Sequence, residues 1–259
     1  GSLVSASLNP HVLRDEQRIS AFVGLLLVFF FLSLSFFKGA ALLGDPDTGW
    51  HIATGEWIWT HGALPQTDPF SHTFAGEPWF AKEWLSQLLY YAGYALAGWN
   101  GVVILAAVAI AAGACALYWV LSRDLSHVHA AFVCVLAVML ASGSFVARPH
   151  LLTLPLLVLW TDGVFRAAAK GAAPRVGWLF LFVLWANLHG AFTLGLLIAF
   201  FAFADFLEKG GAGRQAAKRR WLVFLALCLL ATLVHPYGWK SLFATWTVYG
   251  SNEAMSMIT

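Results

Sequence analysis

The chain has 259 residues, of which 60% are hydrophobic and 11% are charged, and it contains 13 Trp and 21 Phe. A mean hydropathy of +0.73 excludes an ordinary soluble domain and indicates a polytopic membrane protein. The formal net charge of +2 excludes little by itself, and we expect no nucleic-acid partner. The three cysteines lie inside apolar runs without metal-ligand spacing, so we interpret them as small buried hydrophobic residues.

Seven apolar segments dominate the chain, and a helix needs about 20 residues to cross a bilayer. They are about 20–37, 101–122, 128–147, 150–166, 176–189, 191–207 and 220–236. We therefore predict an all-α polytopic membrane protein with about seven transmembrane helices, in one transmembrane domain over residues 1–259. Residues 20–37 form the first span, 38–100 a long extracytoplasmic loop with two interfacial helices, and 101–240 six further spans.

The segment 84–98 is the ambiguous one. It is short for a span, and its Ser, Gln and three Tyr residues fit an interfacial helix. Lys and Arg accumulate on the cytoplasmic side of membrane proteins. If 84–98 lies on the surface, all but four of the 15 Lys and Arg residues fall on the side of the N-terminus, whereas this bias disappears if it crosses. We therefore predict a cytoplasmic N-terminus and an external loop at 38–100.

The run 176–207 has basic residues beyond both of its ends, so both ends should be cytoplasmic and the run should form a hairpin. Its turn should fall at Asn187-Leu188-His189-Gly190, within the outer leaflet. Irregular backbone at such depth is tolerated where it is buried in protein or lines a cavity.

The loop at 45–84 holds most of the polar character of the chain. Asp47-Thr48 can cap a helix from about 49 to 61, and Gly62 is a plausible stop. A second helix should start near Lys82. Four carboxylates in this loop are the strongest signal for a site at the membrane surface, namely Asp45, Asp47, Asp68 and Glu83.

The predicted topology brings further polar groups to the same side as this loop. The outward turns carry Arg148-Pro149-His150, Asn187 with His189, and His235-Pro236-Tyr237, while His51 and Trp50 lie in the loop itself. Ionisable residues at membrane depth are costly and mark sites or pathways by default. Each has a structural alternative as well: Asp47 as a helix cap, Asp68-Pro69 as a turn, Glu83 as a first-turn charge, Arg148 as a snorkelling side chain, and the histidines as satisfied interfacial groups.

This combination suits transfer chemistry on a lipid-linked substrate. Carboxylates at an external surface can act as a general base for a hydroxyl acceptor or hold a divalent cation. Arg and His beside them can bind a phosphate. The sequence contains no GxSxG, P-loop or HExxH motif.

The first span followed by Asp47-Thr-Gly-Trp50-His51 resembles the integral-membrane GT-C glycosyltransferases, including oligosaccharyltransferase catalytic subunits. The chain is most similar to bacterial membrane glycosyltransferase-like proteins, through Asp45-x-Asp47-x-x-Trp50-His51, Asp68-Pro-Phe and Glu83-Trp-Leu, and then through the segments at 185–190 and 235–238. It departs from oligosaccharyltransferases, because Ala53 stands where an Arg often follows and no Trp-Trp-Asp motif is present.

The resemblance implies a GT-C module of seven transmembrane helices, a polyprenyl-phosphate-linked sugar as donor and membrane lipid as surroundings. It also implies a bacterial inner-membrane location with the site facing the periplasm. Asp47 would be the general base or metal ligand, with Asp45 as alternate and His51 beside them. Substrate-binding residues would be Arg148, His150, Asn187, His189, His235, Asp68, Glu83 and Trp50. A divalent cation, Mg or Mn, would bind at Asp47 and Asp68, although several enzymes of this type work without metal.

Other classes of function stay open at this point. A transporter or flippase of lipid-linked precursors would use the same phosphate-binding groups without chemistry, although we see no internal repeat of the kind many transporters show. A non-catalytic subunit of a membrane assembly is another possibility. A haem or metal protein ligated by His150, His189 and His235 is the last.

Overall fold

The computed structural model describes residues 10–73, 75–210 and 214–240. This part of the chain is all-helical, which confirms the predicted class, and its only extended pairing is an isolated bridge between Thr67 and Pro78. The helices are α1 Pro10–Phe37, α2 Gly39–Leu42, α3 Asp47–His61, α4 Trp84–Leu121, α5 His127–Ala141, the 3₁₀ turn η1 Ser142–Ser144, α6 Pro149–Leu152, α7 Leu154–Ala169, α8 Trp178–Leu188, α9 Phe192–Glu208 and α10 Gln215–Ala231.

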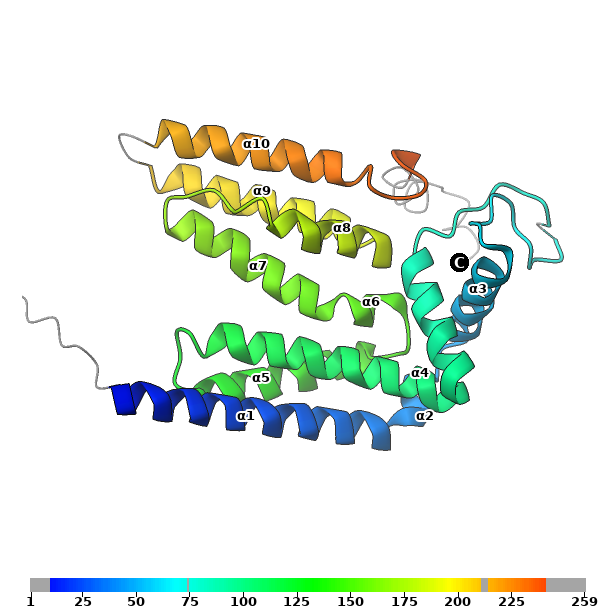
Figure 1. The fold of residues 1–259 in the computed structure, drawn as a ribbon, viewed down its shortest axis with the longest axis horizontal. Coiled ribbons are helices and arrows are strands. Elements are labelled where there is room, and N and C mark those ends of the chain that lie inside the picture. Colours follow the sequence, from blue (N-terminus) through cyan, green and yellow to red (C-terminus); the bar gives the residue numbers. More distant parts are fainter. Residues whose placement is uncertain (1–9, 74, 211–213, 241–259) are drawn as a thin grey trace, which may run out of the picture.

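Most of the long helices run alongside one another, and α3 stands across one end of the bundle together with the first half of α4 (Figure 1). Within the described residues, three helices are long and apolar enough to cross a membrane, over Arg18–Ser35, Trp84–Leu121 and His127–Ser144. α8 is apolar but shorter. Many large apolar side chains on the outside of α1 are exposed, as expected of a surface that faces lipid rather than water.

α4 is two helices joined at a kink. Ala97 has φ −147° and Gly98 has φ +59°, a left-handed value that a residue with a side chain rarely adopts. The turn is also tight, because a Cβ placed on Gly101 would lie 1.8 Å from the carbonyl oxygen of Gly93. The ambiguous stretch 84–98 is therefore a helix that ends at this kink and lies across the end of the bundle, while the chain from Gly101 onward runs with the other long helices (Figure 1).

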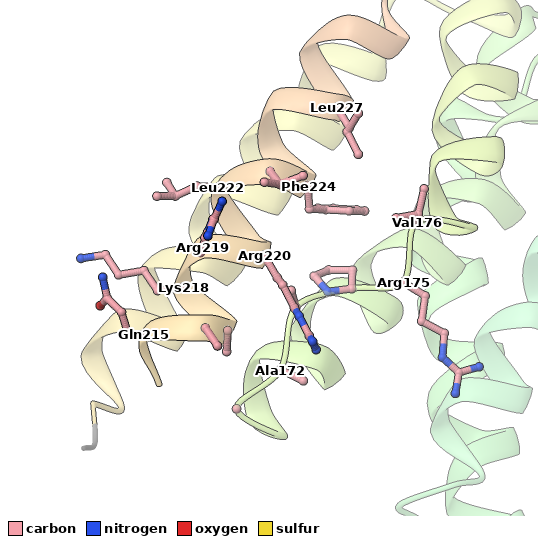
Figure 2. A pocket seen from close by; sticks show the side chains of 16 residues that line it. Ala172, Arg175, Val176, Gln215, Lys218, Arg219, Arg220, Leu222, Phe224 and Leu227 are labelled. Atoms are coloured by element: carbon pink, nitrogen blue, oxygen red, sulfur yellow. The ribbon is translucent and has the colours of Figure 1, made fainter. Parts of the chain in front are cut away.

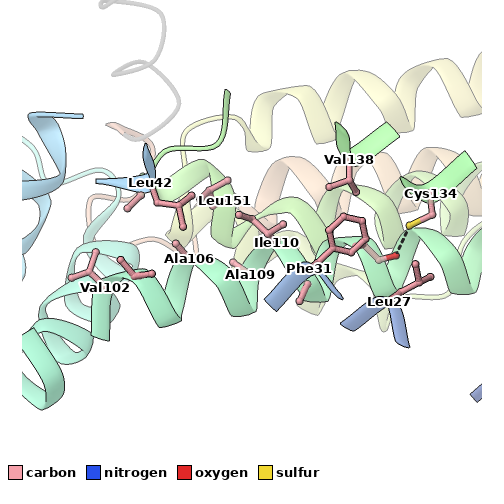
Figure 3. Packing of buried hydrophobic residues seen from close by; sticks show 14 of the residues in the cluster. Leu27, Phe31, Leu42, Val102, Ala106, Ala109, Ile110, Cys134, Val138 and Leu151 are labelled. Carbon is pink, nitrogen blue, oxygen red and sulfur yellow. Dashed lines mark hydrogen bonds between the residues drawn. The ribbon is translucent and has the colours of Figure 1, made fainter. Parts of the chain in front are cut away.

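Two hydrophobic clusters hold the bundle together. The first joins α1, α4 and α5, where small alanines such as Ala106 and Ala109 of α4 allow close approach beside Phe31 of α1 and Val138 of α5 (Figure 3). The second joins α7 to α10 and is built from buried aromatic residues, including Trp160 and Trp221. α4 and α7 link the two, and Gly113 packs so closely that a Cβ there would lie 2.9 Å from Cβ of Leu154.

Candidate functional site

An acidic cluster with one guanidinium forms the start of α3. Asp45 Oδ1 accepts the backbone N–H of Asp47 at 2.9 Å, so the Asp45 side chain closes the turn that begins the helix. Arg148 then binds both carboxylates: its Nε lies 2.7 Å from Asp45 Oδ2, and its Nη2 contacts both Asp45 Oδ1, at 3.0 Å, and Asp47 Oδ2. The prediction that Asp47 caps the helix is wrong, because Pro46 occupies the cap position and Asp47 is the first helical residue. The Asp47 carboxylate does not cap the helix, and it is instead exposed and paired with Arg148.

The backbone around Arg148 is fixed from three directions. Ala147 donates its N–H to Leu42 O at 2.7 Å and accepts the Thr48 hydroxyl at 3.0 Å. The fully buried Tyr90 donates its hydroxyl to Arg148 O at 2.9 Å. The guanidinium therefore meets the two carboxylates through contacts of the segment before α6 with α2, α3 and α4.

His51 lies one helical turn after Asp47, beside this cluster. Burial lowers its pKa to about 4, and the positive charge of Arg148 adds to that effect against the opposing charges of Asp47 and Asp45. Its Nδ1 is buried and has no hydrogen-bond partner within the described ranges. A neutral imidazole with an unused ring nitrogen is a group that can hydrogen-bond a substrate.

Glu83 and His189 form a second, partly buried pair, one from the residue before α4 and one from the turn after α8. His189 Nδ1 accepts the backbone N–H of Ala191 at 3.1 Å, so the neutral ring carries its proton on Nε2 and donates it to Glu83 Oε1, 3.1 Å away. Burial raises the pKa of Glu83, while the backbone N–H of Gly190 opposes that rise.

His235 repeats the same arrangement at the end of α10. Its Nδ1 accepts the backbone N–H of Tyr237 at 3.3 Å, and its Nε2 lies 3.1 Å from Lys82 O. His235 and His189 therefore fasten two consecutive residues, Lys82 and Glu83, to the bundle. Both nitrogens of each ring are engaged, so neither ring offers the lone pair that a haem or metal ligand needs.

Asn187 and His150 also make contacts that fix the backbone. Asn187 Oδ1 accepts the indole N–H of Trp84 at 2.9 Å, and its Nδ2 donates to Val183 O and Val234 O. His150 Nε2 lies 3.1 Å from Ser144 O, and its ring centroid is 6.3 Å from that of His189. Asn187 and His150, both predicted to bind substrate, therefore already form hydrogen bonds within the protein.

Asp68 lies in a turn between α3 and α4, and Trp50 of α3 contacts aromatic residues of that connecting segment. Asp68 Oδ1 accepts the backbone N–H groups of Phe70 and Ser71 at 2.8 and 3.0 Å, and bonding from the Ser71 hydroxyl and these N–H groups holds the pKa of Asp68 below its usual range. Trp50, Phe70 and Trp79 form an aromatic cluster with Trp50 ring centroids 5.0 and 6.0 Å from the other two. No hydrogen bond or charge interaction in the described segments joins Asp68 to Asp47, the pair predicted to hold a metal.

The donor set for a divalent cation is small. Across the residues that the structure describes, no group of three or more His, Cys, Asp and Glu side chains could hold a metal ion. Mg²⁺ or Mn²⁺ at Asp45 and Asp47 would share both carboxylates with Arg148.

Sequence reasoning assigned no site role to four residues that build the site. Tyr90 and Trp84 lie in the stretch whose role was ambiguous, and Thr48 was read only as part of a cap. Ser86, also in that stretch, donates its hydroxyl to Leu188 O at 2.6 Å. The only sign of these residues in the sequence is that they are polar groups in or next to an apolar segment. From composition alone, such groups are interpreted as interfacial.

No family model matches the chain, and no curated protein or solved structure shows significant similarity to it.

Proposed function

We propose that this protein is a membrane glycosyltransferase that moves a sugar from a polyprenyl-phosphate-type lipid donor to an acceptor on the extracytoplasmic side. The observation that carries the proposal is the meeting of Asp45, Asp47, Arg148 and the neutral His51 at one end of an apolar helix bundle. An anionic group, a cation and a neutral hydrogen-bonding group in contact are what proton removal beside a phosphate requires.

The geometry favours different roles for the two aspartates. The Asp45 side chain is 15% exposed and is engaged by the backbone of Asp47 as well as by two nitrogens of Arg148, so it is a positioning residue. The Asp47 side chain is 57% exposed and contacts Arg148 through one oxygen. Asp47 is therefore the proposed base that takes the proton from the acceptor hydroxyl, which then attacks the anomeric carbon as the bond to the lipid phosphate breaks.

Arg148 is the proposed partner of the leaving phosphate. Its side chain is 39% exposed, and guanidinium groups bind phosphates through paired, charge-assisted hydrogen bonds. A donor phosphate would compete with Asp47 for Arg148 and free that carboxylate to act as a base. His51 Nδ1 is the proposed hydrogen-bonding contact to the sugar or acceptor.

Two apolar cavities near this end could receive the lipid chain. One, of about 600 Å³, lies between α3 and the start of α4, and the other, of about 540 Å³, lies between α4, α8 and the end of α10. They share Trp84 and Pro236 in their walls and are thus adjacent. The second is also lined by Asn187 and His235, which ties it to the predicted site residues.

The proposed topology is a seven-span GT-C type module in the bacterial inner membrane, with a cytoplasmic N-terminus and the site facing the periplasm. The spans would be α1, the second half of α4, α5, α7, α8, α9 and α10. The arrangement supports this, because the connections after α4 and α7, the last turn of α9 and the first turn of α10 lie at the end where α1 begins, and α2, α3 and α6 lie at the other end (Figure 1). α8 has only 11 residues, so its turn to α9 would lie within the membrane rather than beyond it.

The test is Asp47→Asn, with Glu56→Gln as a matched control on the same helix. Glu56 is exposed and carries a carboxylate at a position outside the proposed site. The assay follows a covalent sugar product from a radiolabelled polyprenyl-phosphate sugar, with the full chain in membranes. We expect Asp47→Asn to lower turnover by about 100-fold or more and Glu56→Gln to leave it unchanged.

Three outcomes would revise the proposal. Full turnover by Asp47→Asn removes Asp47 as the base. Movement of the lipid across liposomes without a covalent product favours a transporter. Loss of turnover in EDTA with recovery on adding Mg²⁺ or Mn²⁺ assigns a cation to the site, where Asp45 and Asp47 would hold it.

A further inference from the structure

A cavity of about 1300 Å³ lies far from the acidic cluster, between the connection from α7 to α8 and the first half of α10 (Figures 1 and 2). We call it the basic cavity; its walls are residues 171–176 and the 215–227 part of α10. Trp221 fixes their separation, because its buried indole N–H donates to Ala172 O at 2.8 Å.

The charge of the basic cavity is uncompensated. Four cations line it, Arg175, Lys218, Arg219 and Arg220, and no Asp or Glu does. None of the four makes an ion pair with a described residue. Three other cations near the same end, in contrast, are each paired with an aspartate: Arg123, Arg166 and Lys209. Such concentrated positive charge calls for an anionic partner.

Part of the lining of the basic cavity is apolar. Figure 2 shows Phe224 and Leu227 of α10 extending toward Val176, while Arg220 reaches toward Ala172. Val176 is 63% exposed, which is costly in water but not beside a hydrocarbon chain. The cavity therefore offers apolar side chains to an acyl chain and cations to an acidic group.

Arg214 adds a donor at the edge of the basic cavity. Its Nη1 is buried and lacks a hydrogen-bond partner among the described residues. The same guanidinium borders the cavity wall, since a Cβ on Gly171 would lie 3.1 Å from Arg214 Nη2. An unsatisfied buried guanidinium nitrogen is costly, and an anion supplies the missing acceptor.

We propose that the basic cavity binds an anionic phospholipid. The phosphate contacts Arg220, with Arg175, Lys218 and Arg219 around the rim, and an acyl chain lies between Leu227 and Val176. Guanidinium groups suit phosphate oxygens, and basic pockets between membrane helices on the positively charged side are typical sites for acidic headgroups. This site is independent of the sugar-transfer proposal, because it lies at the other end of the bundle.

The experiment titrates the purified full chain in detergent with phosphatidylglycerol or phosphatidylcholine and counts bound lipid by native mass spectrometry. We expect the chain to prefer phosphatidylglycerol. The double variant Arg175→Gln/Arg220→Gln should bind it about 30-fold more weakly, since each cation near a lipid surface contributes about a 5-fold change. The charge-matched control Arg18→Gln/Lys170→Gln removes two exposed cations that do not line the cavity and should bind like the wild type.

A second variant tests the cavity rather than its charge. Ala216 is exposed and lines the basic cavity, so Ala216→Trp fills the space and leaves every cation in place. It should weaken phosphatidylglycerol binding as well. The proposal is overturned if both cavity variants bind phosphatidylglycerol as tightly as the wild type, or if the control loses as much affinity as Arg175→Gln/Arg220→Gln. Complete displacement of the lipid by millimolar inorganic phosphate would instead assign a free-phosphate site.

Discussion

α3 and α4 approach each other closely at Gly55, and this contact provides a test of the fold. A Cβ added there would lie 2.1 Å from the carbonyl oxygen of Gln87, 2.6 Å from its carbonyl carbon and 2.7 Å from Tyr91 Cβ. Two of these atoms are backbone, so no side-chain rotation relieves the overlap. Gly49, two helical turns earlier on the same helix, has nothing within 4 Å of its Cβ position and is the matched control.

The expected loss follows from these distances. Ordinary contact begins near 3.4 Å, so Gly55→Ala requires the two helices to separate by about 1.3 Å. Overpacking of this kind costs about 1–3 kcal/mol, and the better helix propensity of Ala returns about 0.5–1 kcal/mol. The net loss should be about 1–2 kcal/mol, which lowers the melting temperature by about 2–8 °C for a chain of this size. Gly49→Ala gains helix propensity without a steric overlap, so it should be neutral or slightly stabilising.

The assay is thermal unfolding of each full-length variant in the same detergent, followed by size-exclusion chromatography of heated samples. A melting temperature for Gly55→Ala equal to that of Gly49→Ala would refute the packing of α3 on α4. It would also undermine the acidic cluster, because α3 carries Asp47 and His51 to Arg148.

Two further predictions concern buried polar groups. Tyr237→Phe should lower the free energy of unfolding by about 1–3 kcal/mol, because the Tyr237 hydroxyl accepts Ala81 N–H at 3.1 Å and donates to Pro65 O at 2.8 Å. Tyr94→Phe changes a more exposed ring and should be neutral. Equal melting temperatures for the two variants would contradict the hydrogen bonds from Tyr237 to Ala81 and Pro65. His189→Gln should lower the melting temperature, because His189 Nε2 lies 3.1 Å from Glu83 Oε1 and His189 Nδ1 accepts the Ala191 N–H at 3.1 Å. A melting temperature equal to that of the wild type would contradict these contacts.

The sequence by itself determined the all-helical class and the positions of most helices. Long apolar runs have few ways to satisfy their backbone groups in lipid, so hydropathy alone locates them. The stop at Gly62 was also readable, because its φ of +61° is a glycine conformation at a helix end. The carboxylates and histidines that surround the site were visible as polar groups in an apolar chain.

Only the tertiary structure decided what those groups do. The sequence predicts His189 and His235 as substrate-binding residues, and in the structure each uses both ring nitrogens, one on its own turn and one on the segment before α4. Asp68 lies in a local turn, whereas Asp45 and Asp47 meet Arg148, which is about a hundred residues away along the chain. Hydrogen bonds of this kind depend on distance and angle, which composition and spacing do not encode. A residue's type limits the bonds it can make, and packing selects among them.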